Sequence, residues 1–300
     1  MLSIDSKKTK WLLLALFGFG MAWLGFNILS PTRANNLNHQ ITYEVIEQPQ
    51  RTIHTVTIPH DSNYSVIPAV SGELKLITDF VEDRGDTIAA INGGYFDPVN
   101  YKTTSFIVEE SQIVADPRFN ERLIDNPDLQ PYLGKILNRA EFRRYSCGEQ
   151  TRYDIQPHFA PIPFDCTLKG SLGGGPGLLP QDRAIAEAFT AYRDGQKIRD
   201  AIATDSLNAR SAVGITQAGD VILVMVAQQP QQPLSSGISL PELADVLSSL
   251  GAVKATNLDG GSSASLYYDG QSVYGRVDKE GNKIQRPIKS VLLVSKGFRP

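Results

Sequence analysis

The stretch TNLDGGSSASLYYDG, residues 256–270, carries more polar groups than a turn between two strands requires. Apolar runs flank a loop, NLDGGSS at 257–263, in which Asp259 precedes two glycines and two serines. A hairpin needs only a short turn such as Asp-Gly, and Asp269 and Gly270 supply one at the end of the stretch. Because glycines expose backbone N–H groups and serines add hydroxyls, we interpret the first loop as part of a binding or catalytic site.

Three further glycine-containing loops lie beside apolar strands. They are NGGYFDP at 92–98, GGGPG at 173–177 and DSLNARSAVG at 205–214. Singly, each is typical of an ordinary turn. Together with the loop at 257–263 they combine backbone donors, one guanidinium and several carboxylates, a set that suits an anion such as phosphate.

Common nucleotide-binding and hydrolase motifs do not fit these loops. GGGPGLLP at 173–180 lacks the Gly-Lys-Ser/Thr ending of a P-loop, and no dinucleotide fingerprint or G-x-S-x-G elbow occurs. The four histidines lie outside the glycine loops, which argues against a Ser-His-Asp triad. A hydrolase built on this sequence would therefore work mainly with carboxylates, arginine and backbone dipoles.

The strand and helix patterns predict an α+β fold: a mixed, strand-rich single domain with a few helices. SLPELADVLSSLG at 239–251 predicts a helix with a capping box and a C-terminal glycine, and DRAIAEAFTAYRDG at 182–195 has helical periodicity. No regular βαβ alternation is present. Strands are expected at 41–47, 51–59, 87–92, 211–216, 221–228, 252–258, 264–268 and 286–295, and a strand pair at 105–115.

The N-terminus predicts export. Three lysines before residue 11 precede an uncharged run at 11–29, close to the ~20 residues of a membrane-spanning helix. We expect residues 1–34 to form a cytoplasmic lysine cluster followed by a membrane anchor or a signal peptide, and both readings stay open. Residues 35–300 would then lie outside the cytoplasm, in the periplasm or the extracellular space, held to the membrane if the N-terminal helix is kept.

The cysteine pair agrees with an exported domain. Cys147 and Cys166 are the two cysteines of the chain, and in an oxidising compartment we expect them to form a disulfide. A metal site using His158 is the alternative, but the spacing lacks the usual zinc pattern. We interpret the charged, helix-tolerant segment at 116–165 as an insertion or cap carried by the domain.

The bulk composition limits the partners. The formal net charge is −3, and 41% of the residues are hydrophobic and 20% charged, which is ordinary for a globular protein. No basic field is present, so nucleic acid is not an expected partner.

Six pieces of the sequence, taken in order, resemble the phosphodiester glycosidase family. They are INGGYFDP, GGGPGLLP, NARSAVGIT, LPELADVLSSLGA, NLDGGSSAS and RPIKSVLLV, and they span about residues 85–296. The resemblance implies a hydrolase, a glycosidase that cleaves sugar-1-phosphodiester bonds, here in envelope or extracellular glycans. Two departures stand out: Ser262 occupies a place where many relatives carry a third glycine, and Asp97 is not shared by every relative.

The resemblance also implies roles for matching residues. Arg210 would clamp the phosphate with help from backbone amides, Asp259 would act as general base or stabilise the sugar cation, and Asp97 is a second catalytic candidate. Asn92 and Ser263 would hydrogen-bond sugar hydroxyls. The candidate substrate-binding residues are Asn92, Gly93, Gly94, Gly174, Gly175, Gly260, Gly261, Ser262 and Ser263. Ca²⁺ or Mg²⁺ could bind near Asp259 or Asp97, although the sequence shows no complete ligand set.

Two other functions stay open. The Ser262 departure would also suit an envelope glycan-binding module that has lost its chemistry. The same residues could serve a phosphodiesterase that breaks the P–O bond instead of the C–O bond.

Overall fold

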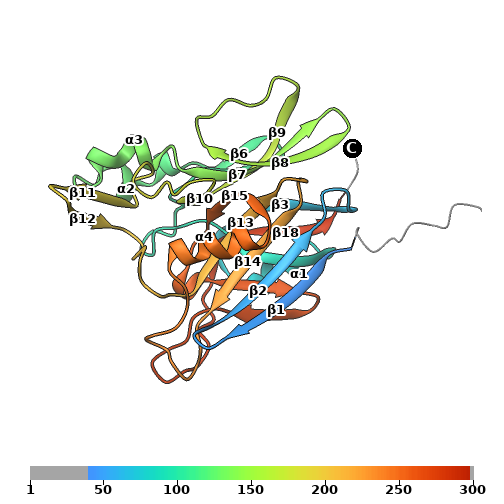
Figure 1. Ribbon diagram of the computed structural model, residues 1–300. Coiled ribbons are helices and arrows are strands. Elements are labelled where there is room, and N and C mark those ends of the chain that lie inside the picture. Colours follow the sequence, from blue (N-terminus) through green and yellow to red (C-terminus); the bar gives the residue numbers. More distant parts are fainter. Residues whose placement is uncertain (1–39, 298–300) are drawn as a thin grey trace, which may run out of the picture. The chain divides into compact units, whose positions relative to one another are not determined.

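The computed structural model describes residues 40–297, and within them strands dominate (Figure 1). Three antiparallel sheets and one two-stranded ribbon hold the chain together, with few helices. This confirms the strand-rich domain expected from the sequence. The proposed anchor or signal segment lies outside the described residues, and across 40–297 no helix has the length and apolarity needed to cross a membrane.

The first sheet contains a strand that is buried on both faces. Its order is β1 (Thr42–Gln48), β2 (Arg51–Ile58), β14 (Val221–Ala227), β13 (Arg210–Thr216), β15 (Ala252–Asn257) and β10 (Gly177–Leu179). In β14 Leu223 and Met225 face the main core, whereas Ile222 and Val224 face the opposite side. The continuous apolar run VILVMVA therefore reflects a central strand with both faces covered.

The second sheet packs against the first through the main hydrophobic core. Its order is β17 (Gln271–Tyr274), β16 (Ser265–Tyr268), β4 (Thr87–Asn92), β18 (Ile288–Lys296) and β3 (Tyr64–Lys75). Ile91, Leu266 and Leu292 of this sheet share one buried cluster with Val56 and Leu223 of the first. The two sheets thus bury their facing side chains against each other.

The third sheet includes the second half of the segment at 116–165 through the strands β7 (Ala140–Cys147) and β8 (Gln150–Pro157). Its order is β6 (Gln112–Ala115), β5 (Ile107–Glu109), β9 (Cys166–Gly173), β7 and β8. Short helical turns, η2 (Pro117–Phe119), α2 (Glu121–Ile124), η3 (Gln130–Tyr132) and α3 (Leu133–Ile136), precede β7. A disulfide joins Cys147 and Cys166, which face each other in the β7–β9 register. The predicted disulfide is confirmed, and a bridge of this span contributes about 3 kcal/mol.

Two helices cover the outer faces of the first two sheets. α4 (Leu240–Ser249) lies over the first sheet (Figure 1). It packs Leu243 and Leu247 onto that sheet, and Ser239 and Glu242 form the expected capping box. α1 (Ile77–Glu82) packs onto the second sheet.

The helix predicted at 182–195 is wrong. Turns lead there into the ribbon of β11 (Thr190–Arg193) and β12 (Gln196–Asp200). Ala188 has a φ of 56°, which no α-helix contains, and the preceding Glu187 is fully buried and receives hydrogen bonds from Gly177 and Arg183. Tertiary contacts of one carboxylate have overridden the local helical periodicity.

The strands that flank the loop at 257–263 belong to different sheets. β15 lies in the first sheet and β16 in the second, so the loop carries the chain across the interface between them. Within the loop, η4 (Gly261–Ser263) forms a single 3₁₀ turn. Asp269 and Gly270, with φ of 42° and 86°, make the expected two-residue turn between β16 and β17. The first loop is thus a crossing between sheets, whereas the second is an ordinary hairpin.

Candidate active site

The four glycine loops converge, and glycine is needed where their backbones touch. A β-carbon on Gly94 would collide with the carbonyl oxygen of Gly173. A β-carbon on Gly174 would lie 2.6 Å from the carbonyl oxygen of Asn257. These contacts bring the loops at 92–98, 173–177 and 257–263 together.

The fourth loop joins them through Gly260. A β-carbon there would lie 2.9 Å from the carbonyl oxygen of Ala209, within the loop at 205–214. In addition, the backbone N–H of Asp259 donates to the carbonyl of Gly93 at 3.0 Å. Residues far apart in the sequence therefore surround Asp259.

Asn92 fixes the loop that carries Asp259. Its Nδ2 donates to the backbone carbonyl of Asp259 at 2.6 Å, while its Oδ1 accepts from Ser211 Oγ at 2.6 Å and from the Ser265 amide at 3.0 Å. The side chain is 0% exposed. Asn92 therefore ties together β4, β13, β16 and the loop, and the expected contact with a sugar hydroxyl stays a prediction.

Asp259 has the electrostatics of a group that exchanges a proton near neutral pH. Removal from water raises the pKa of its carboxyl from 3.8 to about 6. The Ser263 hydroxyl, the charge of Arg286 and the Gly260 amide oppose this rise without cancelling it. Ser263 is 1% exposed, and its hydroxyl lies close enough to the Asp259 carboxylate to lower the pKa of that group. Asp259 itself is partly exposed, which leaves it accessible to a ligand.

The guanidinium of Arg210, expected from the sequence to clamp a phosphate, is bound to backbone carbonyls in this structure. Its side chain is 2% exposed, and its guanidinium donates to the carbonyls of Ile202 at 3.0 Å, Ala203 at 2.7 Å and Ser206 at 3.3 Å. These bonds hold the loop before β13 in place. Here the buried Arg210 acts as a structural element whose donors go to backbone carbonyls, and its phosphate-binding role stays a prediction.

Two other arginines flank the loop of Asp259. Arg286 donates from Nη1 to Ser262 Oγ at 2.9 Å, with its guanidinium 5.0 Å above the ring of Phe96. Arg276 donates from Nη1 to Asn208 Oδ1 at 2.8 Å. Within the described part of the chain, neither forms an ion pair with a carboxylate. These two guanidinium groups, both partly exposed, are the cations available to an anionic ligand.

Sequence reasoning missed both arginines because neither lies in a glycine-rich loop. Arg286 precedes β18 in the piece RPIKSVLLV, and Arg276 follows β17. The pairing of β18 with β4 brings the segment of Arg286 toward Asp259, and the pairing of β17 with β16 brings the segment of Arg276 there. The signal available in the sequence was the position of Arg286 inside a piece shared with the family.

Most glycine amides predicted to bind substrate are occupied by the protein. Four of them donate to carbonyl oxygens, namely Gly93 to Ser290, Gly174 to Ala140, Gly175 to Asn257 and Gly261 to Ala209. The Gly94 amide has no partner among residues 40–297, and the Gly260 amide faces the Asp259 carboxylate. The glycines thus act mainly by permitting close backbone contact.

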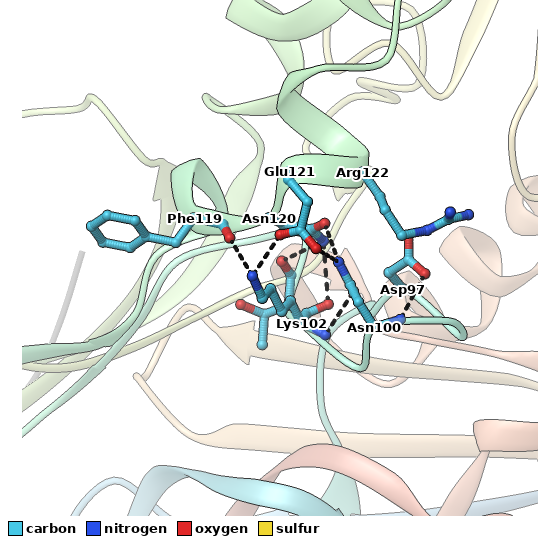
Figure 2. A network of polar contacts seen from close by, with 8 residues as sticks. Asp97, Asn100, Lys102, Phe119, Asn120, Glu121 and Arg122 are labelled. Atoms are coloured by element: carbon cyan, nitrogen blue, oxygen red, sulfur yellow. Dashed lines mark hydrogen bonds and ion pairs between the residues drawn. The ribbon is translucent and has the colours of Figure 1, made fainter.

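Asp97, the second catalytic candidate, is hydrogen-bonded to other parts of the protein. Its carboxylate accepts from Arg122 Nε at 2.9 Å and from the Val99 amide at 2.7 Å (Figure 2). Burial raises its pKa, but the hydrogen bonds from Val99 and Arg122 outweigh that effect, and the net pKa is lowered. In the same network Asn100 and Lys102 contact Glu121. Asp97 therefore ties its loop to α2 and stays ionised, which does not support a catalytic role.

Residues 40–297 contain no group of three or more His, Cys, Asp or Glu side chains placed to hold a metal ion. A Ca²⁺ or Mg²⁺ near Asp259 would thus need ligands beyond such side chains, and it stays a prediction.

Comparison with known proteins places this site within a family. The phosphodiester glycosidase family model matches residues 85–295. None of the curated proteins matches the chain in sequence.

Solved structures share the fold at low identity. The catalytic domain of zebrafish N-acetylglucosamine-1-phosphodiester alpha-N-acetylglucosaminidase, auto-inhibited by its pro-peptide, is 18% identical with a TM-score of 0.60, covering 86% of this chain and 83% of that chain. A putative exported protein from Burkholderia pseudomallei is 15% identical with a TM-score of 0.57, covering 82% and 74%. A hypothetical protein from Synechocystis is 18% identical with a TM-score of 0.54, covering 85% and 62%. Because the family model spans most of the sequence, the chain belongs to the phosphodiester glycosidase family.

Proposed function

We propose that this protein hydrolyses a sugar-1-phosphodiester by breaking the bond between the anomeric carbon and the phosphate oxygen. One observation carries the proposal. Asp259, with a pKa raised to about 6, lies beside Arg286, a guanidinium that has no carboxylate partner in the described structure. A proton-exchanging carboxyl next to an unpaired cation is the combination that a sugar phosphate requires.

Arg286 would bind the phosphate, with the Gly94 amide and Arg276 as further donors. A guanidinium over an aromatic ring is held in one plane, and this favours a two-pronged contact with phosphate oxygens. Ser262 contributes by accepting from Arg286. The departure at Ser262 then has a positive role, since its hydroxyl orients the arginine.

Asp259 would activate water in its ionised form. The water oxygen attacks the anomeric carbon, its proton passes to the Asp259 carboxylate, and the electron pair of the broken C–O bond stays on the leaving phosphate oxygen. The leaving group is a phosphate monoester, already a stable anion, so it needs less protonation than an ordinary alcohol. One carboxylate, Asp259, and one phosphate-binding arginine, Arg286, can therefore suffice for the hydrolysis.

We also propose that the enzyme is exported and acts on envelope or extracellular glycans. The disulfide between Cys147 and Cys166 supports an oxidising compartment. We propose further that an N-terminal helix holds the enzyme to the membrane.

The decisive experiment follows the oxygen of water. Full-length protein is incubated with a panel of sugar-1-phosphodiesters in ¹⁸O-water, and both products are analysed by mass spectrometry. We expect the label in the sugar, and we expect Asp259→Asn to lose at least ~100-fold in kcat while keeping its fold. Label in the phosphate would identify a phosphodiesterase, and glycan binding without turnover would identify a binding module. An arm with EDTA tests the metal: loss of turnover that Ca²⁺ or Mg²⁺ restores would establish the predicted cation site.

A further inference from the structure

A second groove lies away from Asp259, between the edge strand of the second sheet and the third sheet. It consists of two cavities of about 530 Å³ and 470 Å³. Both are lined by Ser65, Thr151 and Gly297, so they form one continuous groove. We call the larger half the cationic half and the smaller half the polar half.

The cationic half concentrates positive charge in an acidic protein. The charged residues that line it are Arg84, Arg144, Lys169, Lys296, Asp86 and Glu110. Four cations against two carboxylates leave a surplus of two positive charges, whereas the whole chain carries −3. Such a local field attracts anions.

Several of these cations have unused bonding capacity. Lys169 and Lys296 form no ion pair or side-chain hydrogen bond with the described residues. Arg144 donates from Nη2 to Glu110 at 2.7 Å, but its buried Nε–H has no acceptor within residues 40–297. A buried donor without a partner costs free energy, so an anion that accepted from it would be stabilised.

The polar half has the side chains that contact sugars. Tyr64 and Tyr153 supply aromatic surface, and His60, Glu149 and Gln150 supply donors and acceptors. Aromatic rings with nearby polar groups suit a sugar ring, which has apolar faces and hydroxyl edges. The polar half also carries the carboxylates of Asp61 and Glu149, so the positive surplus is confined to the cationic half. The groove therefore matches a ligand whose phosphate lies in the cationic half and whose neutral sugar lies in the polar half.

The groove and the active site lie at opposite ends of the same two strands, β4 and β18. Asp86 in the groove directly precedes β4, whose last residue, Asn92, holds Asp259. β18 likewise runs from Ser290, which accepts from Gly93, to Lys296 in the groove. Six residues of strand correspond to roughly 20 Å, so a single small substrate does not reach both sites.

We propose that the groove is an accessory binding site for a phosphate-bearing saccharide, and that it engages a second part of a polymeric substrate. Phosphate oxygens are bound by Arg144, Lys169 and Lys296, and the adjoining sugar lies in the polar half against Tyr64 and Tyr153. Binding to the groove is independent of turnover. Only its link to catalysis rests on the proposed function.

Binding is tested with full-length protein by isothermal titration calorimetry, using phosphorylated dextran, plain dextran and inorganic phosphate as probes. Lys169→Gln/Lys296→Gln removes two cations from the groove, and Asp86→Asn in the same wall is the matched control. We expect about tenfold weaker binding of phosphorylated dextran in the double variant, and equal or tighter binding in the control. Plain dextran and inorganic phosphate alone should bind more weakly than the combined probe.

Several outcomes would overturn the proposal. One is unchanged affinity in the double variant. Another is loss of binding only in Arg286→Ala, which would place the probe in the active site. A third is equal affinity for duplex DNA or for phosphatidylglycerol vesicles, which would show general attraction of anions. Asp259→Asn separates the two proposals, because it should lose turnover and keep groove binding.

Discussion

The loop at 259–263 has an arginine on each side, and the two differ in what their guanidinium groups already bind. The side chain of Arg210 lies against Gly260, and its guanidinium donates to backbone carbonyls. Arg210 is 2% exposed. Arg286 reaches Ser262 with its plane over Phe96 and remains partly exposed. Both residues are arginines that lie against this loop. An arginine is available to a substrate when its guanidinium N–H groups are not already hydrogen-bonded to the protein.

The largest expected effect concerns stability on the Arg210 side. Arg210→Met keeps most of the side-chain volume but leaves the carbonyls of residues 202, 203 and 206 without their donor. We expect the free energy of unfolding to fall by about 3 kcal/mol, measured by urea denaturation. A variant that is fully stable yet inactive would return Arg210 to the chemistry and remove the contrast with Arg286.

The next effect concerns turnover on the Arg286 side. Arg286→Ala should lower kcat/KM about 100-fold, because a charge-assisted phosphate contact is lost, with a change in unfolding free energy below ~1 kcal/mol. Arg286 also lowers the pKa of Asp259, so the midpoint of the pH–rate profile should move above about 6. Arg122→Ala, which removes an exposed arginine bound to Asp97, is the matched control and should leave kcat/KM unchanged. An unshifted pH profile would argue that Arg286 does not act beside Asp259.

A smaller effect is expected on the stability of Asp259→Asn, which should rise although its activity falls. Its pKa is raised on folding from 3.8 to about 6, so the folded protein binds the proton more tightly and loses stability as pH rises between these values. At pH 7 Asp259→Asn should be more stable by about 2 kcal/mol, a value reduced because the side chain is partly exposed. Below pH 4 the difference should vanish. Thermal unfolding of both proteins across this pH range measures it, and equal stability at pH 7 would contradict the buried-carboxylate account.

The smallest effect tests how Arg286 is oriented. Ser262→Gly restores the third glycine found in many relatives but removes the hydroxyl that accepts from Arg286. We expect kcat/KM to fall about fivefold, which corresponds to one hydrogen bond of roughly 1 kcal/mol. Ser262→Thr keeps the hydroxyl and should retain most activity. Higher activity in the glycine variant would mean that the serine hinders the site.

Local patterns predicted the strands of the first two sheets except β3 and the short β10 and β17, because strand alternation and capping depend on neighbouring residues. They missed β7, β8 and β9 of the third sheet. The capping box at Ser239 and the two-residue turn at Asp269 and Gly270 are confirmed. The helix at 182–195 failed because Glu187 is fully buried by residues distant in sequence. Propensity cannot anticipate a contact of that kind.

For the site, the sequence located the loops but not the use of each group. Asp259 and the convergence of four glycine loops were predicted, and both are present in the structure. Asn92 and Arg210 proved to be bound by the protein, and Arg286 was overlooked. Whether a polar group is free depends on its hydrogen-bond partners, and these are set by strand pairing between sheets.

The loop at 257–263, which crosses from the first sheet to the second, couples the relative position of the two sheets to Asp259. Leu258 is completely buried in the core that both sheets share, and Asp259 is the next residue. Any change that lets one sheet slide against the other would therefore shift the carboxylate directly. Cavity-forming substitutions deep in that interior, such as Leu292→Ala, should make turnover more sensitive to temperature without altering a single side chain that touches the substrate.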